Sequence, residues 1–200
     1  MKKLDGIKLL ALDVDGVLTD GGLFYTPEGV IQKFNSTDGA GLITLRKKDF
    51  PVALISFRDF PATRRRAADL GIEILCLGSD RKAAALSGIC RSLSIDCDEA
   101  LFIGDGILDL PALRLAGVAA CPADAHPLVK AECDIVTEKS GGRGAVREVV
   151  DMLLGSFKPV CPLRGSPQSF QDRIGMASDN IRTRKGNFRS GGENSRRSRR

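Results

Sequence analysis

The segment Ile7-Lys8-Leu9-Leu10-Ala11-Leu12-Asp13-Val14-Asp15-Gly16 carries most of the information about the fold of this chain. Its first six residues are mostly apolar, which is typical of a buried parallel strand, although periodicity alone does not exclude a helix. Side chains alternate along a strand, so Asp13 and Asp15 are expected on the same side at its carboxyl end. Open α/β sheets bind their ligands at that end. The segment therefore predicts a site with two carboxylates on one tight turn.

Such a pair of acids has two interpretations. Neighbouring carboxylates repel each other unless a divalent cation lies between them, so the pair indicates a metal site. One acid can then act as a nucleophile while the other transfers a proton. The alternative is an acidic surface turn, and Asp-x-Asp by itself does not decide between the two.

Three later segments favour the catalytic interpretation. Leu54-Ile55-Ser56 is an apolar run that ends in a hydroxyl, Lys82 opens a helical stretch, and Ile103-Gly104-Asp105-Gly106-Ile107-Leu108-Asp109 carries two more acids. Together with residues 13–21, these segments resemble, in the same order, the four motifs of the haloacid dehalogenase superfamily of phosphohydrolases. Four motifs in order are far more specific than any one of them.

The resemblance implies roles for the acids of the first and fourth motifs. Asp13 matches the nucleophile that forms an aspartyl-phosphate, and Asp15 matches the general acid that becomes the general base. The carboxylates of Asp13 and Asp105, with the backbone carbonyl of Asp15, match the ligands of a magnesium ion, which prefers oxygen ligands. Taken alone, Asp105 also fits an acid at a helix N-terminus.

The same resemblance gives roles to the remaining motif residues. Ser56 and Lys82 match the groups that hold the phosphoryl oxygens, with Lys82 offsetting the charge that develops in the transition state. Asp109 is expected to orient Lys82 or the loop. Taken singly, Ser56 is better explained as a hydroxyl that caps the next segment, and Lys82 as a solvated lysine on a helix.

The chain up to about residue 155 alternates strands and helices, which predicts an α/β fold with a doubly wound parallel sheet. A β-hairpin insertion is expected from the two apolar runs that flank Pro27-Glu28-Gly29, and no stretch is long enough for a separate cap domain. The hairpin strands are expected at 23–26 and 30–34, the sheet strands at 7–12, 52–55, 73–76, 100–103 and, as short edge strands, 118–120 and 134–136, and the helices at 41–48, 62–70, 81–93, 110–116 and 145–154.

Several further segments narrow the resemblance to one capless subgroup. Residues 13–21, the hairpin, Asn35-Ser36-Thr37-Asp38-Gly39, Ala123-Asp124-Ala125-His126-Pro127 and Gly141-Gly142-Arg143-Gly144-Ala145-Val146-Arg147-Glu148 resemble the family of 3-deoxy-D-manno-octulosonate 8-phosphate phosphatases. The similarity covers nearly all of residues 7–154. It implies magnesium-dependent hydrolysis of an acidic sugar phosphate in lipopolysaccharide biosynthesis, by a homotetramer whose hairpins and tails close active sites across subunit interfaces.

The subgroup also suggests residues that bind the substrate. Arg143 is a candidate for the sugar carboxylate because a guanidinium bonds it in a bidentate way, and Arg58 and Asp38 are further candidates beside Ser56. His126 is expected to support the site without taking part in catalysis. Without the resemblance, the glycines around Arg143 would indicate only a flexible loop before a helix.

Two positions depart from the superfamily pattern. The fourth motif usually carries paired acids, but the second of them is Gly106 in this chain, which predicts weaker binding of magnesium. The second motif usually has a glycine where this chain has Phe57, which adds bulk beside the phosphate site. These departures leave two alternatives open: a phosphatase for another sugar or nonulosonate phosphate, and a catalytically weak homologue that acts as a binding or scaffold module.

Composition sets the remaining expectations. Residues 156–200 hold eleven Lys and Arg against three Asp and Glu, so the net charge of +5 hides a slightly acidic body. This segment is expected to be a disordered tail (156–200) after a phosphatase domain (1–155), with nucleic-acid binding unlikely except through the tail. The six cysteines are scattered, which is typical of reduced thiols in a cytoplasmic protein. The sequence has no long apolar run and no recognisable signal peptide, so we expect a cytoplasmic protein that does not enter membranes.

Overall fold

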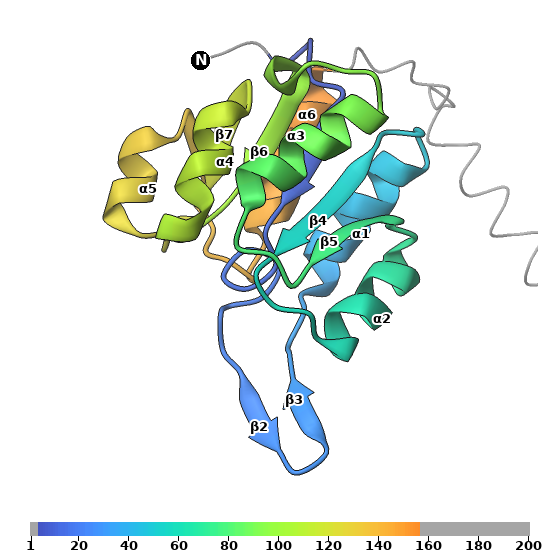
Figure 1. Ribbon diagram of the computed structural model, residues 1–200, viewed down its shortest axis with the longest axis vertical. Helices are drawn as coiled ribbons and strands as arrows, with labels where there is room; N and C mark the ends of the chain where they lie inside the picture. The colour runs from blue at the N-terminus through green and yellow to red at the C-terminus, as the bar shows by residue number, and fades with distance from the viewer. Residues whose placement is uncertain (1–3, 157–200) are drawn as a thin grey trace, which may run out of the picture. The chain divides into compact units, whose positions relative to one another are not determined.

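The computed structural model describes residues 4–156, and Figure 1 shows how their helices and strands are arranged. The basic segment from residue 157 to residue 200 lies outside the described residues. The disordered tail and the domain boundary near Gly155 therefore stay predictions. Among residues 4–156, no helix is long and apolar enough to cross a membrane.

A six-stranded parallel sheet forms the centre of the fold, with the strand order β5-β4-β1-β6-β7-β8. This arrangement confirms the predicted doubly wound α/β fold. One expectation was wrong, because β7 lies between β6 and β8 and only β8 is an edge strand on that side. The strands are β1 (Leu9–Leu12), β4 (Val52–Ser56), β5 (Ile74–Leu77), β6 (Ala100–Ile103), β7 (Val118–Cys121) and β8 (Ile135–Val136).

Helices cover both faces of the sheet. Successive strand residues point to opposite faces, so Leu10 and Leu12 of β1 pack against α1, α2 and α6, whereas Leu9 and Ala11 pack against α3, α4 and α5. Both faces are apolar for this reason, and the strands read as nearly continuous hydrophobic runs. The helices are α1 (Ser36–Arg46), α2 (Pro61–Leu70), α3 (Lys82–Ser92), α4 (Leu110–Leu115), α5 (Pro127–Glu132) and α6 (Ala145–Ser156).

Two helices differ from the sequence-based expectation. Helix α1 begins at Ser36, earlier than expected, because Asn35 caps it by accepting a hydrogen bond from the backbone N–H of Thr37 at 2.7 Å. Helix α5 was not expected at all. The side chain of His126 caps its first turn by accepting a hydrogen bond from the backbone N–H of Leu128.

The expected hairpin is present as β2 (Phe24–Thr26) and β3 (Gly29–Ile31), and Figure 1 shows it extending away from the sheet. Its apolar side chains are among the most exposed in the described chain, with Tyr25 78% and Phe24 64% accessible. No separate cap domain is present among residues 4–156. The five cysteines in this part of the chain are free thiols.

The strand order places a site at the middle of the sheet. After β1, the chain builds β4 and β5 on one side and later β6, β7 and β8 on the other, so the order reverses beside β1. Leu12 of β1 lies opposite Leu54 of β4 and Ile103 of β6. The residues that follow these three strands therefore meet at one edge, which is where doubly wound sheets bind ligands.

Candidate active site

The turn that follows β1 is held by its own backbone and by one buried hydroxyl. The backbone N–H groups of Leu18 and Thr19 both donate to the carbonyl of Val14, at 2.9 and 3.0 Å. The Thr19 side chain is fully buried, and its oxygen accepts hydrogen bonds from the N–H groups of Gly16 and Gly21. The turn is thus a rigid support for Asp13 and Asp15.

A glycine pair from the distant end of the domain packs against this turn. Gly142 donates its N–H to the carbonyl of Val17 at 2.9 Å. A Cβ atom on Gly141 would lie 1.8 Å from the carbonyl oxygen of Gly16, so no larger residue fits there. Asp124 and Asn35 fix the same pair, by accepting from the Gly141 N–H and by donating to the Gly142 carbonyl.

A buried lysine lies between two buried aspartates. Nζ of Lys82 is 3.0 Å from Oδ2 of Asp13 and 2.6 Å from Oδ1 of Asp109, and all three side chains are less than 10% accessible. Lys82 is the first residue of α3, which carries it to the edge of the sheet beside β1. The structure therefore brings these three predicted residues together.

The loop after β6 places Asp105 beside Asp13. Oδ2 of Asp109 accepts the backbone N–H groups of both Asp105 and Gly106 at 3.0 Å, so Asp109 orients the loop as well as Lys82. Asp105 faces Gly16, where a Cβ atom would lie 2.1 Å from its Oδ2 and where φ is +89°. Only glycine fits both requirements at that position.

Burial dominates the electrostatics of these groups. Burial, together with the nearby charge of Asp109, raises the pKa of Asp13 to about 7 and the pKa of Asp105 to about 6, although the charge of Lys82 opposes both shifts. Burial also disfavours the charged form of Lys82, but the two carboxylates outweigh that effect and raise its pKa. The lysine thus stays protonated between its two carboxylate partners.

The acid cluster fits a divalent cation. Oxygen atoms of Asp13, Asp105 and Asp109 lie within 4.8 Å of one another. Oδ1 of Asp13 is buried and has no hydrogen-bond partner among the described residues, which leaves its lone pairs free for a metal ion. Both oxygens of Asp109 are occupied by Lys82 and by backbone N–H groups. Asp13 and Asp105 are therefore the carboxylates that would hold a hard cation.

Asp15 stands apart from that cluster and is held by two other side chains. Nε2 of Gln32 donates to its Oδ1 at 2.8 Å, and Nη1 of Arg58 donates to its Oδ2 at 3.3 Å. Arg58 is 43% exposed and its guanidinium lies over the ring of Phe57, 6.0 Å from the centroid. Asp15 is therefore positioned by residues from the hairpin return and from the loop after β4.

An open cleft of about 650 Å³ joins these groups, with Asp13, Asp15, Ser56, Lys82 and Asp105 in its lining. Oγ of Ser56 accepts the backbone N–H of Arg58 at 3.2 Å, which leaves its own O–H free to donate to a bound anion. The hydrogen bond to the next segment is thus present, and the role of Ser56 in holding phosphoryl oxygens stays a prediction. Exposed apolar side chains form part of the rim: Phe57, Ile107 and Leu108.

Two predicted substrate-binding residues do not line this cleft. Asp38 is fully buried in α1, and its carboxylate accepts the backbone N–H groups of Gly144 and Arg147, where α6 begins. Arg143 is exposed and lies 3.9 Å from Asp20 at the foot of the hairpin. Asp38 thus has a structural contact that explains its burial. His126 lines the cleft and donates its backbone N–H to the carbonyl of Asp105.

Three side chains at the site were not singled out from the sequence. Thr19 and Asp124 hold the turn and the glycine pair, and Gln32 contacts Asp15 directly. Gln32 stands beside the charged Lys33 in the sequence, so no local signal distinguished it.

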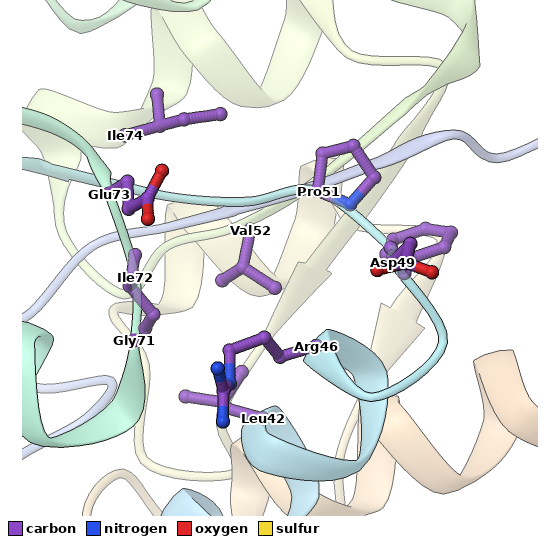
Figure 2. A pocket seen from close by; sticks show the side chains of 10 residues that line it. Leu42, Arg46, Asp49, Pro51, Val52, Gly71, Ile72, Glu73 and Ile74 are labelled. Atoms are coloured by element: carbon purple, nitrogen blue, oxygen red, sulfur yellow. The ribbon is translucent and has the colours of Figure 1, made fainter.

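A second hollow, of about 290 Å³, lies at the opposite end of the sheet. Figure 2 shows its lining, which comes from the end of α1 and from the segments that lead into β4 and β5. Its charged residues, Arg46, Asp49 and Glu73, are exposed to solvent. None of the predicted site residues lies there.

Comparison with known proteins identifies the family. The model of the haloacid dehalogenase-like hydrolase family matches residues 67–149. The 3-deoxy-D-manno-octulosonate 8-phosphate phosphatase of Haemophilus influenzae is 42% identical over 154 residues, which cover 76% of this chain and 86% of that protein. The Escherichia coli enzyme of the same name is 41% identical over 155 residues, 77% of this chain and 82% of the enzyme.

This chain belongs to the family of 3-deoxy-D-manno-octulosonate 8-phosphate phosphatases. The resemblance stated from the motifs is thereby confirmed, as is the class of enzyme, a phosphoric monoester hydrolase.

Solved structures of the family agree with the fold. A cobalt-bound phosphatase from Haemophilus influenzae matches with a TM-score of 0.77 and 39% identity, over 85% of this chain and 99% of that one. The Moraxella catarrhalis phosphatase, solved with a magnesium ion, a phosphate ion and a KDO molecule, matches with a TM-score of 0.75 and 35% identity, over 88% of this chain and 96% of that one. Metal binding is thus a property of these family members.

Proposed function

We propose that this protein hydrolyses 3-deoxy-D-manno-octulosonate 8-phosphate, with magnesium as its cofactor and an aspartyl-phosphate on Asp13 as the intermediate. The observation that carries the proposal is the group of Asp13, Lys82, Asp105 and Asp109 at the carboxyl edge of the sheet. The family membership supports the choice of substrate, because curated relatives carry this activity in their names.

The first step is transfer of the phosphoryl group to the protein. A carboxylate oxygen of Asp13 attacks the phosphorus, and the bond from phosphorus to the sugar oxygen breaks with its electron pair on that oxygen. Asp15 gives its proton to this oxygen, so the sugar leaves as an alcohol. Lys82 and the hydroxyl of Ser56 offset the negative charge on the phosphoryl oxygens.

The second step restores the enzyme. Asp15, now a carboxylate, takes a proton from water, and the water oxygen attacks the phosphorus of the aspartyl-phosphate. The bond from phosphorus to Asp13 breaks, which returns the carboxylate and releases inorganic phosphate. A magnesium ion held by Asp13 and Asp105 would neutralise charge on the phosphoryl group and on the acids that bind it.

A substrate screen tests the proposal. Phosphate release is measured on 3-deoxy-D-manno-octulosonate 8-phosphate, on other sugar and nonulosonate phosphates, and on an unrelated phosphate monoester, each with magnesium and with a chelator. We expect the highest kcat/KM on the first compound and no turnover without a divalent cation. A higher kcat/KM on a nonulosonate phosphate would show that the proposed substrate is wrong, while the proposed reaction mechanism would still stand.

The exposed hairpin supports a homotetramer in which neighbouring copies cover the open clefts. Phe24, Tyr25 and Ile31 are each more than half exposed, and a two-stranded hairpin of this kind is only marginally stable alone. We expect light scattering to give a tetrameric mass at micromolar concentration, and a smaller mass for Tyr25→Ser with Ile31→Ser. A monomeric wild-type protein would contradict this assembly. The expected cytoplasmic location remains a prediction.

A further inference from the structure

The side chain of Gln32 connects Asp15 to helix α2. Gln32 directly follows β3, where the hairpin returns to the sheet, and only 8% of it is exposed. Its Nε2 donates to Oδ1 of Asp15 at 2.8 Å, and its Oε1 accepts from the hydroxyl of Thr63 at 2.8 Å. Thr63 is itself buried, with 2% of its surface accessible. The three side chains form one continuous hydrogen-bonded chain into the cleft.

The chemistry of the partners fixes the orientation of the amide. Asp15 as a carboxylate only accepts hydrogen bonds, so the amide must turn its N–H₂ group toward it. The carbonyl oxygen then faces Thr63, whose hydroxyl can donate to it. A flipped amide would place two acceptors against each other at Asp15. Gln32 is thus held in one orientation from both ends.

We infer that Gln32 is a positioning residue for Asp15, which rests on the proposed role of Asp15 in acid and base catalysis. The amide N–H bonds to a lone pair of Oδ1, so Oδ2 is the oxygen left to carry the transferred proton. Oδ2 is contacted only weakly by the exposed side chain of Arg58, at 3.3 Å. Gln32 therefore directs the proton-bearing oxygen toward the leaving group.

The isosteric variant Gln32→Glu tests this role. Glutamate keeps the shape and the acceptor for Thr63, but it replaces the donor to Asp15 with a second acceptor. We expect kcat for 3-deoxy-D-manno-octulosonate 8-phosphate to fall about tenfold or more, with KM within about threefold, because misplaced general acid–base groups lose part of a 10²–10⁴-fold effect. The first-turnover release of nitrophenolate from p-nitrophenyl phosphate should stay near the wild-type rate, since this leaving group needs no proton.

Thr63→Val provides a second variant in case Gln32→Glu fails to fold. Valine removes only the donor that orients the amide, so a smaller fall in kcat is expected, and Thr63→Ser should restore the wild-type value. Thr44→Val is the matched control, because the Thr44 hydroxyl bonds to its own helix at Ala40 and not to the site. Thermal unfolding of each variant checks that the fold is intact.

The outcomes separate the inference from the proposed function. If the wild-type protein hydrolyses no phosphate monoester, both are overturned. If the wild-type protein is active but folded Gln32→Glu and Thr63→Val both turn over the sugar phosphate within about twofold of it, only the positioning role is overturned. An equal loss in nitrophenolate release and in sugar phosphate turnover would also overturn it, because that result indicates general damage to the site.

Discussion

Both ends of the central sheet carry a hollow, but the charged side chains are buried at one end and exposed to solvent at the other. At the carboxyl ends of the strands, Asp13, Lys82 and Asp109 are at most 6% exposed. At the amino ends, the charged residues around the smaller hollow in Figure 2 remain in solvent. Removing an ion from water costs several kcal/mol. Buried charge, more than a hollow in the surface, therefore distinguishes the end that carries the candidate site.

The largest expected effect comes from Asp13→Asn, which breaks the reactive end outright. An amide cannot form the acyl phosphate, so turnover should fall roughly a thousandfold or more while the protein remains folded. Steady-state phosphate release and circular dichroism measure the two properties. A variant that kept most of its activity would exclude Asp13 as the nucleophile.

Removal of the central lysine should affect stability as well as activity. Lys82→Met leaves Asp13 and Asp109 as buried carboxylates without their shared partner, and breaking such a pair costs about 3–5 kcal/mol. Urea unfolding at pH 8, in buffer that contains a chelator, measures this loss in the free energy of unfolding. Glu73→Gln at the opposite hollow is the control and should stay within about 0.5 kcal/mol of the wild type. Equal free energies of unfolding for the two variants would show that the buried charges do not contribute more to stability than the exposed ones.

The buried acids at the carboxyl end of the sheet should make stability depend on pH. Folding raises the pKa of Asp13 to about 7 and of Asp105 to about 6, from the ordinary value of 3.8. The folded state therefore holds these protons more tightly, and the stability that they provide below pH 4 is lost as the pH rises to about 7. Magnesium displaces the protons, so it should raise Tm more at pH 8 than at pH 5.5. An equal rise at both pH values would contradict the shifted pKa values.

Gly106→Asp restores the acid that the superfamily pattern contains. A Cβ atom at this position would lie 3.8 Å from Oδ2 of Asp109, which is an ordinary contact, and the backbone is extended. We expect the magnesium concentration for half-maximal activity to fall by a modest factor, within the roughly 10–100-fold range of residues around a metal's direct ligands. Gly6→Asp, at an open and exposed position, is the control. An unchanged magnesium dependence would show that this chain does not need the acid.

The smallest effect is expected from removing the basic tail. Truncation after Ser156 keeps all of α6, and the phosphatase domain should retain its fold and its activity at high salt. At low salt, loss of the positive charge should raise KM for the anionic substrate if the tail attracts it, because screening is weak there. A truncated protein that does not fold would show that the domain extends further.

Local patterns predicted the strands and the catalytic acids because both follow from residues close in sequence. Asp13 and Asp15 lie in the turn directly after β1, and the strand order brings Asp105 to the same edge. The start of α1 was missed because Gly39 and Gly41 lower helix propensity. In the structure these glycines allow close packing, since Cβ atoms there would lie 2.2 Å from Arg66 and 3.0 Å from Arg147.

Contacts between residues far apart in the sequence explain why the positions of two other side chains were not predicted. Asp38 was expected at the substrate, but its partners at the start of α6 lie more than a hundred residues further along the chain. The contact between Gln32 and Asp15 depends on the path of the hairpin between them, which no local pattern specifies. Sequence patterns therefore predicted the residues that we propose to react, whereas the groups that hold them required the structure.

The packing of the Gly141-Gly142 pair against the turn after β1 has a consequence for how the enzyme is made. A ribosome releases Asp13 and its turn early, while the glycines that support the turn, and strand β6 beside it, emerge much later. Contacts between distant segments form only after the intervening chain has been synthesised and closed into a loop. Asp13, the proposed nucleophile, is therefore among the first residues of the site to be translated and among the last to reach its final position. We therefore expect a chain that ends before Gly141 to lack phosphatase activity, so that activity would report on completion of the domain.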